Sequence, residues 1–360
     1  MAKHEVVKLG FIGSGFMGQL AHIENYYKQP NVEKVALAEG RLKTANLVAQ
    51  RYGIKKVYAH HRDMLRDADI DAVVAIAHFD LNAPLVEDTL NAGKHVLTEK
   101  PQVNTSVKGH ELAKLAKDHG LVYQVGYMKR FDPGVRWAKQ RIEQWIETGE
   151  FGPLQSVRIW CAHGEWNWFR PSPLDAGDEP VDYGLALEPK PAWANGKAWQ
   201  LLKEWTNYYS HQTNLARYLI GQDFELQTAK RIENNHFVQC AYQPTGAHLY
   251  FDFPVFQTDS WHEGFEVVFK RAKLTASLPA PLATNQTARI VAYEHGSETG
   301  QYVRPSLPSV DGFARQSQNF IAAVREEKTP LSPASEAVKE IEFAESLVQL
   351  YQRQGDVGDE

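Results

Sequence analysis

The chain has 360 residues, of which 43% are hydrophobic and 23% charged, a composition typical of a globular protein with two domains. Its 39 lysines and arginines and 44 aspartates and glutamates are spread without a basic block, which argues against nucleic acid as a partner. No apolar run approaches the roughly 20 residues that cross a bilayer, and no signal-type leader precedes Val6. We therefore expect a cytoplasmic enzyme without a membrane partner.

The first 128 residues alternate short apolar runs with segments of helical periodicity. This α/β pattern predicts a parallel sheet covered by helices on both faces. After the first run, Phe16, Leu20, Ile23 and Tyr27 recur at the spacing of one helix face. Strands are predicted over residues 6–12, 32–38, 72–77, 95–98 and 121–125.

After residue 128 the strands are longer and alternate between apolar and polar residues, as in an antiparallel sheet with one covered face. We therefore place a domain boundary near residue 128, between domains 1–128 and 129–360. The proline-rich stretch 164–199 is predicted to be a long ordered loop. In the second domain we predict strands over 155–163, 224–232, 237–242, 247–253, 265–270 and 288–293, and helices over 137–147, 213–220, 312–326 and 333–353.

Gly13, Gly15 and Gly18 form the pattern G-x-G-x-x-G, with Phe16 and Met17 at its variable positions. The pattern follows a predicted strand and opens a predicted helix, which is the context of a dinucleotide-binding loop. The first glycine permits a tight turn, the second lets the backbone approach a pyrophosphate, and the third lets helix and strand pack closely. The phosphates would be bound by free N–H groups at the helix N-terminus.

Glu39 ends the second predicted strand, 21 residues after Gly18. An acidic side chain at this place accepts hydrogen bonds from the adenosine ribose and repels a 2′-phosphate, which favours NAD over NADP as the cofactor. Arg41 and Lys43 follow closely, and such cations would tolerate a phosphate. NADP therefore stays open as the alternative.

The segment 91–101, NAGKHVLTEKP, ends in the tripeptide Glu99-Lys100-Pro101. With the glycine pattern, this segment resembles the Gfo/Idh/MocA oxidoreductases, named for glucose–fructose oxidoreductase, inositol dehydrogenase and a rhizopine-catabolism protein. Further matching segments are 125–133, 210–221 and 320–325. The resemblance covers nearly the whole chain and is tightest over its first 135 residues.

The resemblance implies an N-terminal Rossmann domain and a C-terminal α+β domain with a large open, mostly antiparallel sheet. It places the substrate in a cleft beside the nicotinamide and implies a homodimer or homotetramer joined through the C-terminal sheet. Family members act on a hydroxyl-bearing carbon of a sugar, cyclitol or polyol and need no metal, and no metal-binding pattern stands in this sequence. Positions matching Ala77, Asn82, Glu99 and Lys100 would lie at the cofactor.

Lys100 matches the family's catalytic lysine, whose ammonium can polarise the reacting oxygen. His211 matches the catalytic histidine, and an imidazole can take and return a proton near neutral pH. Asn207 and Asn214 stand where many members carry Asp around this histidine. An asparagine can bind a sugar hydroxyl or orient the imidazole but cannot stabilise an imidazolium by charge, so we expect a less basic histidine. Ala77 and Asn82 also depart from the family's usual Thr and His.

Substrate binding has four further candidates. Arg130 would contact the substrate or brace the domain junction, and Lys129 would attract an anionic group. Trp166 and Trp168 alternate on a segment expected to be extended, which would put both indoles on one face. They would either stack on a sugar ring or form the loop's own small core.

Three hypotheses follow from these features. The first is an NAD-dependent dehydrogenase that oxidises a ring hydroxyl of a sugar, cyclitol or glycoside. The second is an oxidoreductive glycoside-cleaving enzyme that recycles NAD in place. The third is a dinucleotide-responsive regulatory protein without turnover, suggested by Asn207 and Asn214 but opposed by the retained Lys100 and His211.

Overall fold

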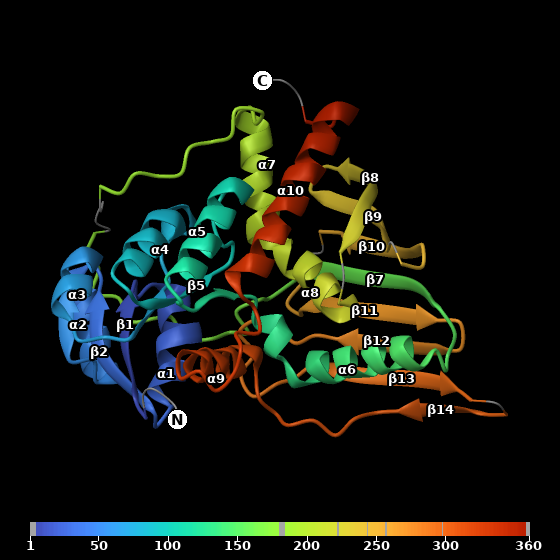
Figure 1. Cartoon of the computed structure of the whole chain (residues 1–360), viewed down its shortest axis with the longest axis horizontal. Coiled ribbons are helices and arrows are strands. Elements are labelled where there is room, and N and C mark those ends of the chain that lie inside the picture. The colour runs from blue at the N-terminus through green and yellow to red at the C-terminus, as the bar shows by residue number, and fades with distance from the viewer. Residues whose placement is uncertain are drawn as a thin grey trace. The chain divides into compact units, whose positions relative to one another are not determined.

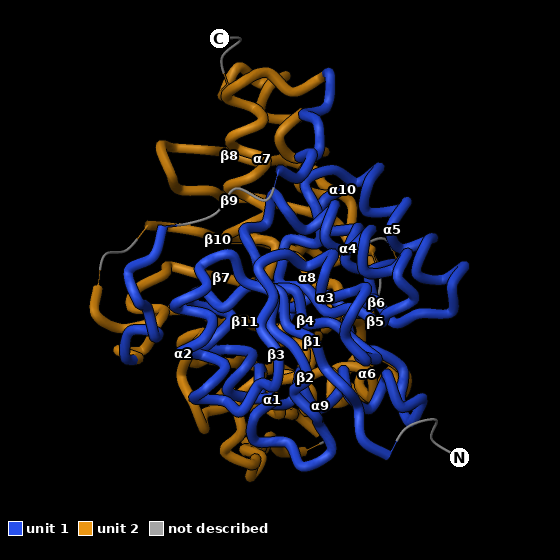
Figure 2. The backbone as a smooth tube through the Cα atoms, turned by 90° about the vertical axis from the view of Figure 1, so that its left-hand side faces the viewer, with its two compact units in different colours: residues 1–127, 171–192, 313–342 blue, residues 128–170, 193–312, 343–360 orange. Residues whose placement is uncertain are grey.

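The computed structural model describes residues 5–179, 184–221, 223–242, 244–255, 258–296 and 298–357. The chain divides into two compact units, which Figure 2 colours separately. Unit 1 consists of residues 1–127, 171–192 and 313–342, and unit 2 of residues 128–170, 193–312 and 343–360. Within the described residues, no helix is long and apolar enough to span a membrane.

Unit 1 is built on a six-stranded sheet whose paired strands are all parallel (Figure 1). The order β3-β2-β1-β4-β5-β6 is that of a Rossmann fold, as predicted. Only β3 was not predicted, because three half-exposed residues are too few to show a period. The strands are β1 (Val7–Ile12), β2 (Val32–Ala38), β3 (Lys56–Tyr58), β4 (Ala72–Ala75), β5 (His95–Glu99) and β6 (Tyr123–Gly126).

Helices bury both faces of this sheet. Neighbouring residues of β4 show the division, since Val73 packs in one apolar cluster and Val74 in the other. The helix after β1 is present, but most of it is a π-helix, η1, and its last turn is α1. The helical elements are η1 (Gly18–Ile23), α1 (Glu24–Tyr27), α2 (Leu42–Tyr52), α3 (His61–Asp67), η2 (Phe79–Leu81), α4 (Asn82–Asn91) and α5 (Ser106–Asp118).

Two later stretches of the chain complete unit 1, although their place in the sequence suggested the second domain. Phe320 and Val324 of α9 (Gly312–Val324) pack with Leu9 of β1, and Ile341 of α10 (Ala334–Gln354) packs with Val96 of β5. The segment 171–192 is the other stretch. Burial of these apolar side chains against the sheet is what draws the later residues into unit 1.

Unit 2 contains an eight-stranded sheet of order β14-β13-β12-β11-β7-β10-β9-β8. Only β7 and β10 pair in parallel, so the sheet is mostly antiparallel, as predicted. Its strands are β7 (Leu154–His163), β8 (Phe224–Ile232), β9 (Asn235–Tyr242), β10 (Ala247–Phe253), β11 (His262–Phe269), β12 (Ala272–Ser277), β13 (Arg289–His295) and β14 (Gly300–Val303).

One face of this sheet is covered by helices. Ile142 of α6 and Leu215 of α8 pack in the same cluster as Ile159 of β7 and Phe251 of β10. Here α7 replaces the end of the predicted loop, because Asn195 caps its first turn by accepting a hydrogen bond from Ala198 N. The helices are η3 (Met128–Phe131), α6 (Pro133–Thr148), α7 (Gly196–Tyr208) and α8 (Ser210–Ile220).

Candidate active site

The glycine loop between β1 and η1 has the geometry of a nucleotide cradle. Gly13 has φ +85°, and a Cβ there would lie 2.1 Å from the carbonyl oxygen of Ile76, so only glycine fits. A Cβ on Gly18 would lie 2.9 Å from the carbonyl oxygen of Gly13. A Cβ on Gly15 would meet nothing within 4 Å, so this backbone faces open space. The residues present therefore fit a pyrophosphate approaching Gly15.

Glu39 follows β2 and is hydrogen-bonded to this loop. Its Oε2 accepts hydrogen bonds from Ser14 N at 3.0 Å and Ser14 Oγ at 3.1 Å, and Arg41 donates from Nε and from a terminal guanidinium nitrogen at 3.1 and 2.9 Å. Burial alone would raise the pKa of Glu39, but the hydrogen bonds from Arg41 and Ser14 outweigh it and hold that pKa below its ordinary value. Glu39 is therefore an ionised carboxylate beside the loop.

Lys100 follows the last residue of β5 and is half-buried. The peptide bond between Lys100 and Pro101 is cis. Asn82 holds the backbone around it, since its Nδ2 donates to the carbonyl oxygen of Pro101 at 2.7 Å and to that of Glu99 at 3.3 Å. On the other side, Glu99 Oε1 lies 2.8 Å from Nε2 of the buried His22. The structure thus brings two predicted cofactor residues, Asn82 and Glu99, against the lysine's own backbone.

The remaining predicted cofactor positions surround the same loop in unit 1. Phe16 and Met17 are half-buried at the start of the helix after β1, and Met17 packs against the apolar cluster under the sheet. Ala77 is half-buried two residues after β4 and packs in the cluster on the other face. Arg41 forms an ion pair with Glu39 at 2.9 Å.

His211 lies in the first turn of α8, in unit 2, and is half-buried. Asn207 is half-buried in the last turn of α7. Asn214, one turn after His211, is 1% exposed, and its Oδ1 accepts a hydrogen bond from Arg130 Nε at 2.7 Å. Arg130 also lies 5.3 Å above the ring of Tyr218. These contacts join η3 to α8 within unit 2.

Lys129 is also directed into unit 2, where it forms an ion pair with Glu263 of β11. Glu263 is 3% exposed and accepts two further hydrogen bonds, from Gln212 Nε2 at 2.6 Å and Trp261 Nε1 at 3.0 Å. Lys129 lies 5.8 Å above the Trp261 ring. The buried ion pair of Lys129 and Glu263, with the hydrogen bonds from Gln212 and Trp261, joins η3, α8 and β11.

Sequence reasoning missed Glu263, although a signal for it exists. Glu263 lies two residues before Phe265 and four before Val267, so all three side chains are on the same face of β11. Phe265 and Val267 are fully buried, so alternation alone directs the Glu263 carboxylate into the core. His163, at the end of β7, was missed as well, and its ring packs against Tyr209 and Trp261. Burial lowers the pKa of His163, so its imidazole is neutral at neutral pH.

The two tryptophans expected on one extended face lie in a turn instead. Trp168 and Phe169 have φ of 56° and 54°, and Asn167 Oδ1 accepts a hydrogen bond from Phe169 N at 2.8 Å. This local asparagine turn replaces the extended backbone, so the prediction of an extended segment was wrong. Trp166 and Trp168 are 43% and 41% exposed. By contrast, Trp193, Trp199 and Trp205 pack with the core of unit 2.

Comparison with known proteins identifies the first part of the chain. The family model described as "Oxidoreductase family, NAD-binding Rossmann fold" (GFO_IDH_MocA) matches residues 7–127. An inositol 2-dehydrogenase/D-chiro-inositol 3-dehydrogenase of Lacticaseibacillus casei is 33% identical over 160 residues, or 42% of this chain and 44% of the relative. Levoglucosan dehydrogenase of Pseudarthrobacter phenanthrenivorans is 28% identical over 225 residues, or 60% of this chain and 52% of the relative.

In these matches the chain spans about half the length of the curated relatives. The fold is shared over a longer range. The crystal structure of scyllo-inositol dehydrogenase from Lactobacillus casei superposes with a TM-score of 0.71 over 98% of both chains, at 16% identity. The glycine loop, the Glu-Lys-Pro segment and the family match agree, and residues 7–127 belong to the Gfo/Idh/MocA oxidoreductase family.

Proposed function

We propose that this protein is an NAD-dependent dehydrogenase that oxidises a ring hydroxyl of a sugar, cyclitol or glycoside. The observation that carries the proposal is the Glu39 carboxylate, bound by Ser14 and Arg41 beside a glycine loop that is open at Gly15. The same unit holds Lys100, whose neighbouring backbone carbonyls accept hydrogen bonds from Asn82. The names of the relatives, an inositol dehydrogenase and a levoglucosan dehydrogenase, support the class of substrate.

The preference for NAD rests on Glu39. A carboxylate accepts hydrogen bonds from the two ribose hydroxyls of NAD but repels the 2′-phosphate of NADP. Arg41, the nearest cation, is already paired with Glu39, which weakens the case for a phosphate clamp. The bound dinucleotide supplies the hydride acceptor.

The roles of the two reacting side chains follow from their chemistry. We assign Lys100 Nζ to donate a hydrogen bond to the substrate oxygen, where negative charge develops as the hydride leaves. We assign a ring nitrogen of His211 to accept the hydroxyl proton. Asn214 is neutral and is bound to Arg130, so it supplies no charge that would raise the basicity of His211. The Trp166 and Trp168 indoles are exposed enough to stack on the C–H face of a sugar.

We also propose that the protein is a homo-oligomer joined through the face of the unit 2 sheet opposite its helices. Residues that alternate with the buried ones on β7, β9 and β10 include Trp160, Phe237 and Tyr250, and the last two stack with ring centroids 6.0 Å apart. Aromatic side chains of this kind are enriched at interfaces. Light scattering should show a dimer or tetramer that Phe237→Asp dissociates, and a monomeric wild type would refute the proposal.

Turnover is tested with purified protein, NAD and a panel containing myo-inositol, scyllo-inositol, levoglucosan and alkyl glucosides. We expect NADH to accumulate with at least one of them. Cleaved glycoside formed without net NADH would indicate the glycoside-cleaving alternative. NAD binding without product from any compound would favour the regulatory alternative.

Lys100→Met tests the assigned chemistry, with Lys114→Met on the exposed face of α5 as the control of equal charge change. Lys100→Met should lower kcat by about a hundredfold or more, since removing one donor to a developing oxyanion has that effect. NAD affinity should change little, because the lysine acts on the substrate oxygen. Equal activity of both variants would refute the role of Lys100.

A further inference from the structure

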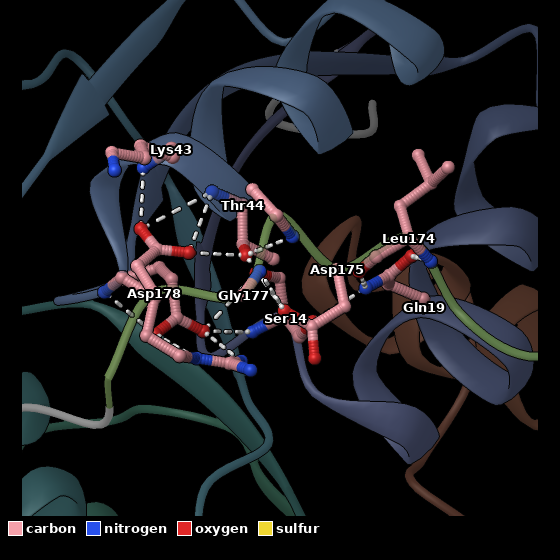
Figure 3. Close-up of polar contacts among 11 residues, drawn as sticks. Ser14, Gln19, Lys43, Thr44, Leu174, Asp175, Gly177 and Asp178 are labelled. Atoms are coloured by element: carbon pink, nitrogen blue, oxygen red, sulfur yellow. Dashed lines mark hydrogen bonds and ion pairs between the residues drawn. The ribbon is translucent and has the colours of Figure 1, made fainter.

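The segment that follows residue 170 lies along the nucleotide-binding elements of unit 1 (Figure 3). Its first anchor is Gln19 on η1, directly after the glycine loop. Gln19 Nε2 donates to the carbonyl oxygen of Leu174 at 2.9 Å, and Gln19 Oε1 accepts from Leu174 N at 2.9 Å. The same amide donates to the carbonyl oxygen of Ser14 at 2.7 Å, so Leu174 is tied to the loop itself.

The second anchor is the N-terminus of α2, which begins three residues after Glu39. Asp178 accepts hydrogen bonds from Lys43 N at 2.7 Å, Thr44 N at 3.2 Å and the Thr44 hydroxyl at 2.6 Å. Asp175 Oδ1 lies 3.3 Å from the same hydroxyl, which in turn accepts from Ala176 N at 3.0 Å. Arg41, the residue directly before α2, does not cap the helix with its side chain. A carboxylate from a distant part of the sequence therefore caps this helix.

Free amides at a helix N-terminus bind anions, because the N–H groups and the helix dipole both favour negative charge. At α2 these amides already hold the carboxylate of Asp178. Hydrogen bonds from Thr44 and from the α2 amides lower the pKa of Asp178, so this carboxylate is ionised at neutral pH. Arg41 interacts with Asp175 and Asp178 as well as with Glu39, and this environment raises the pKa of Arg41.

We propose that Asp178 is a specificity-determining residue that reserves the nucleotide site for NAD. It fills the amides of α2 where the 2′-phosphate of NADP would bind, and it adds a second negative charge beside Glu39. This inference rests on the proposed function, in which Glu39 binds the adenosine ribose. It assigns part of the cofactor preference to a residue that lies 134 positions beyond Thr44 in the sequence.

The experiment compares the wild type with Asp178→Asn in calorimetric titrations of the full chain with NAD, NADP, 5′-AMP and 2′,5′-ADP. The last two probe only the adenosine end of the site. Asparagine keeps the acceptor that caps α2 and removes the charge. We expect the affinity for NADP and for 2′,5′-ADP to rise about tenfold relative to their unphosphorylated partners, the scale of removing one close like-charge contact. Thermal melting checks that the variant folds.

The control is Asp63→Asn, an exposed residue of α3 that changes the net charge by the same amount. It should leave the NADP to NAD affinity ratio at the wild-type value. An unchanged ratio in Asp178→Asn, in a protein that prefers NAD, would overturn the inference and leave the proposed function standing. A wild type that prefers NADP would contradict both, because the proposed function is NAD-dependent. A wild type that binds none of the four nucleotides would instead contradict the proposed function.

Discussion

Replacement of Glu263 by glutamine tests how the buried ion pair supports unit 2. Glutamine keeps the shape of the side chain but leaves the Lys129 ammonium, 7% exposed, without its counter-charge. Breaking a buried pair on one side costs about 3–5 kcal/mol. The Trp261 ring 5.8 Å from Lys129 Nζ offsets part of this loss. We therefore expect Glu263→Gln to lower the free energy of unfolding by about 3 kcal/mol, a large share of the roughly 5–15 kcal/mol that stabilises a domain.

Tryptophan fluorescence during urea unfolding measures the loss of stability in unit 2. All nine tryptophans of the chain lie within the residues of unit 2, so their emission reports the unfolding of that unit alone. The control is Asp252→Asn, which breaks the exposed pair with Arg158 on the same sheet. Exposed pairs contribute less than about 1 kcal/mol, so this variant should unfold near the wild-type midpoint.

The double variant Lys129→Met with Glu263→Gln separates a lost charge partner from lost packing. Since methionine removes the unpaired ammonium, we expect the double variant to recover at least half of the stability that Glu263→Gln loses. Equal effects of Glu263→Gln and Asp252→Asn would show that the buried pair stabilises unit 2 no more than an exposed one. Additive losses in the double variant would refute the reasoning, because the two side chains would then not be coupled.

The glycine loop, the Lys100 clamp and a buried histidine give three further predictions. Gly15→Ala should keep the wild-type melting temperature but weaken NAD binding, because the added methyl group lies in open space. Gly13→Ala should weaken binding and also lower the melting temperature, because Gly13 has a positive φ and a methyl group there would meet the carbonyl oxygen of Ile76. Equal melting temperatures of the two variants would contradict this prediction. Asn82→Ala should lower kcat by about a hundredfold with NAD affinity retained, because it releases the Lys100 backbone, and a loss confined to NAD affinity would argue against this role. Burial lowers the pKa of His236 to about 4 from 6.5, so the unfolded chain takes up a proton first and stability falls as the pH drops between these values, by about 3 kcal/mol in total. From pH 7 to pH 4 the urea midpoint of the wild type should fall relative to that of His236→Phe, and parallel curves would refute the assignment.

Local patterns predicted most of the regular structure. The apolar runs around Phe11, Val35 and Val74 form strands of the unit 1 sheet, as predicted. A strand buried on both faces is apolar along nearly its whole length, so composition alone identifies it. The short strands β3 and β14 at the sheet edges were missed, since few residues and edge exposure remove the period. The interior strand β12 was missed as well, although its buried residues alternate. The turn at Trp168 was misjudged because a single asparagine side chain determined its backbone.

Local sequence specifies the glycine loop, the acid after β2 and the lysine after β5, since each depends on neighbours only a few residues away. Only the tertiary structure showed that Asp178 caps α2 and that Glu263 neutralises Lys129. Both contacts join residues 134 positions apart, and such pairings are decided by which buried groups meet once the sheets have formed. A periodic pattern describes the face on which a side chain lies but not the partner that it finds there.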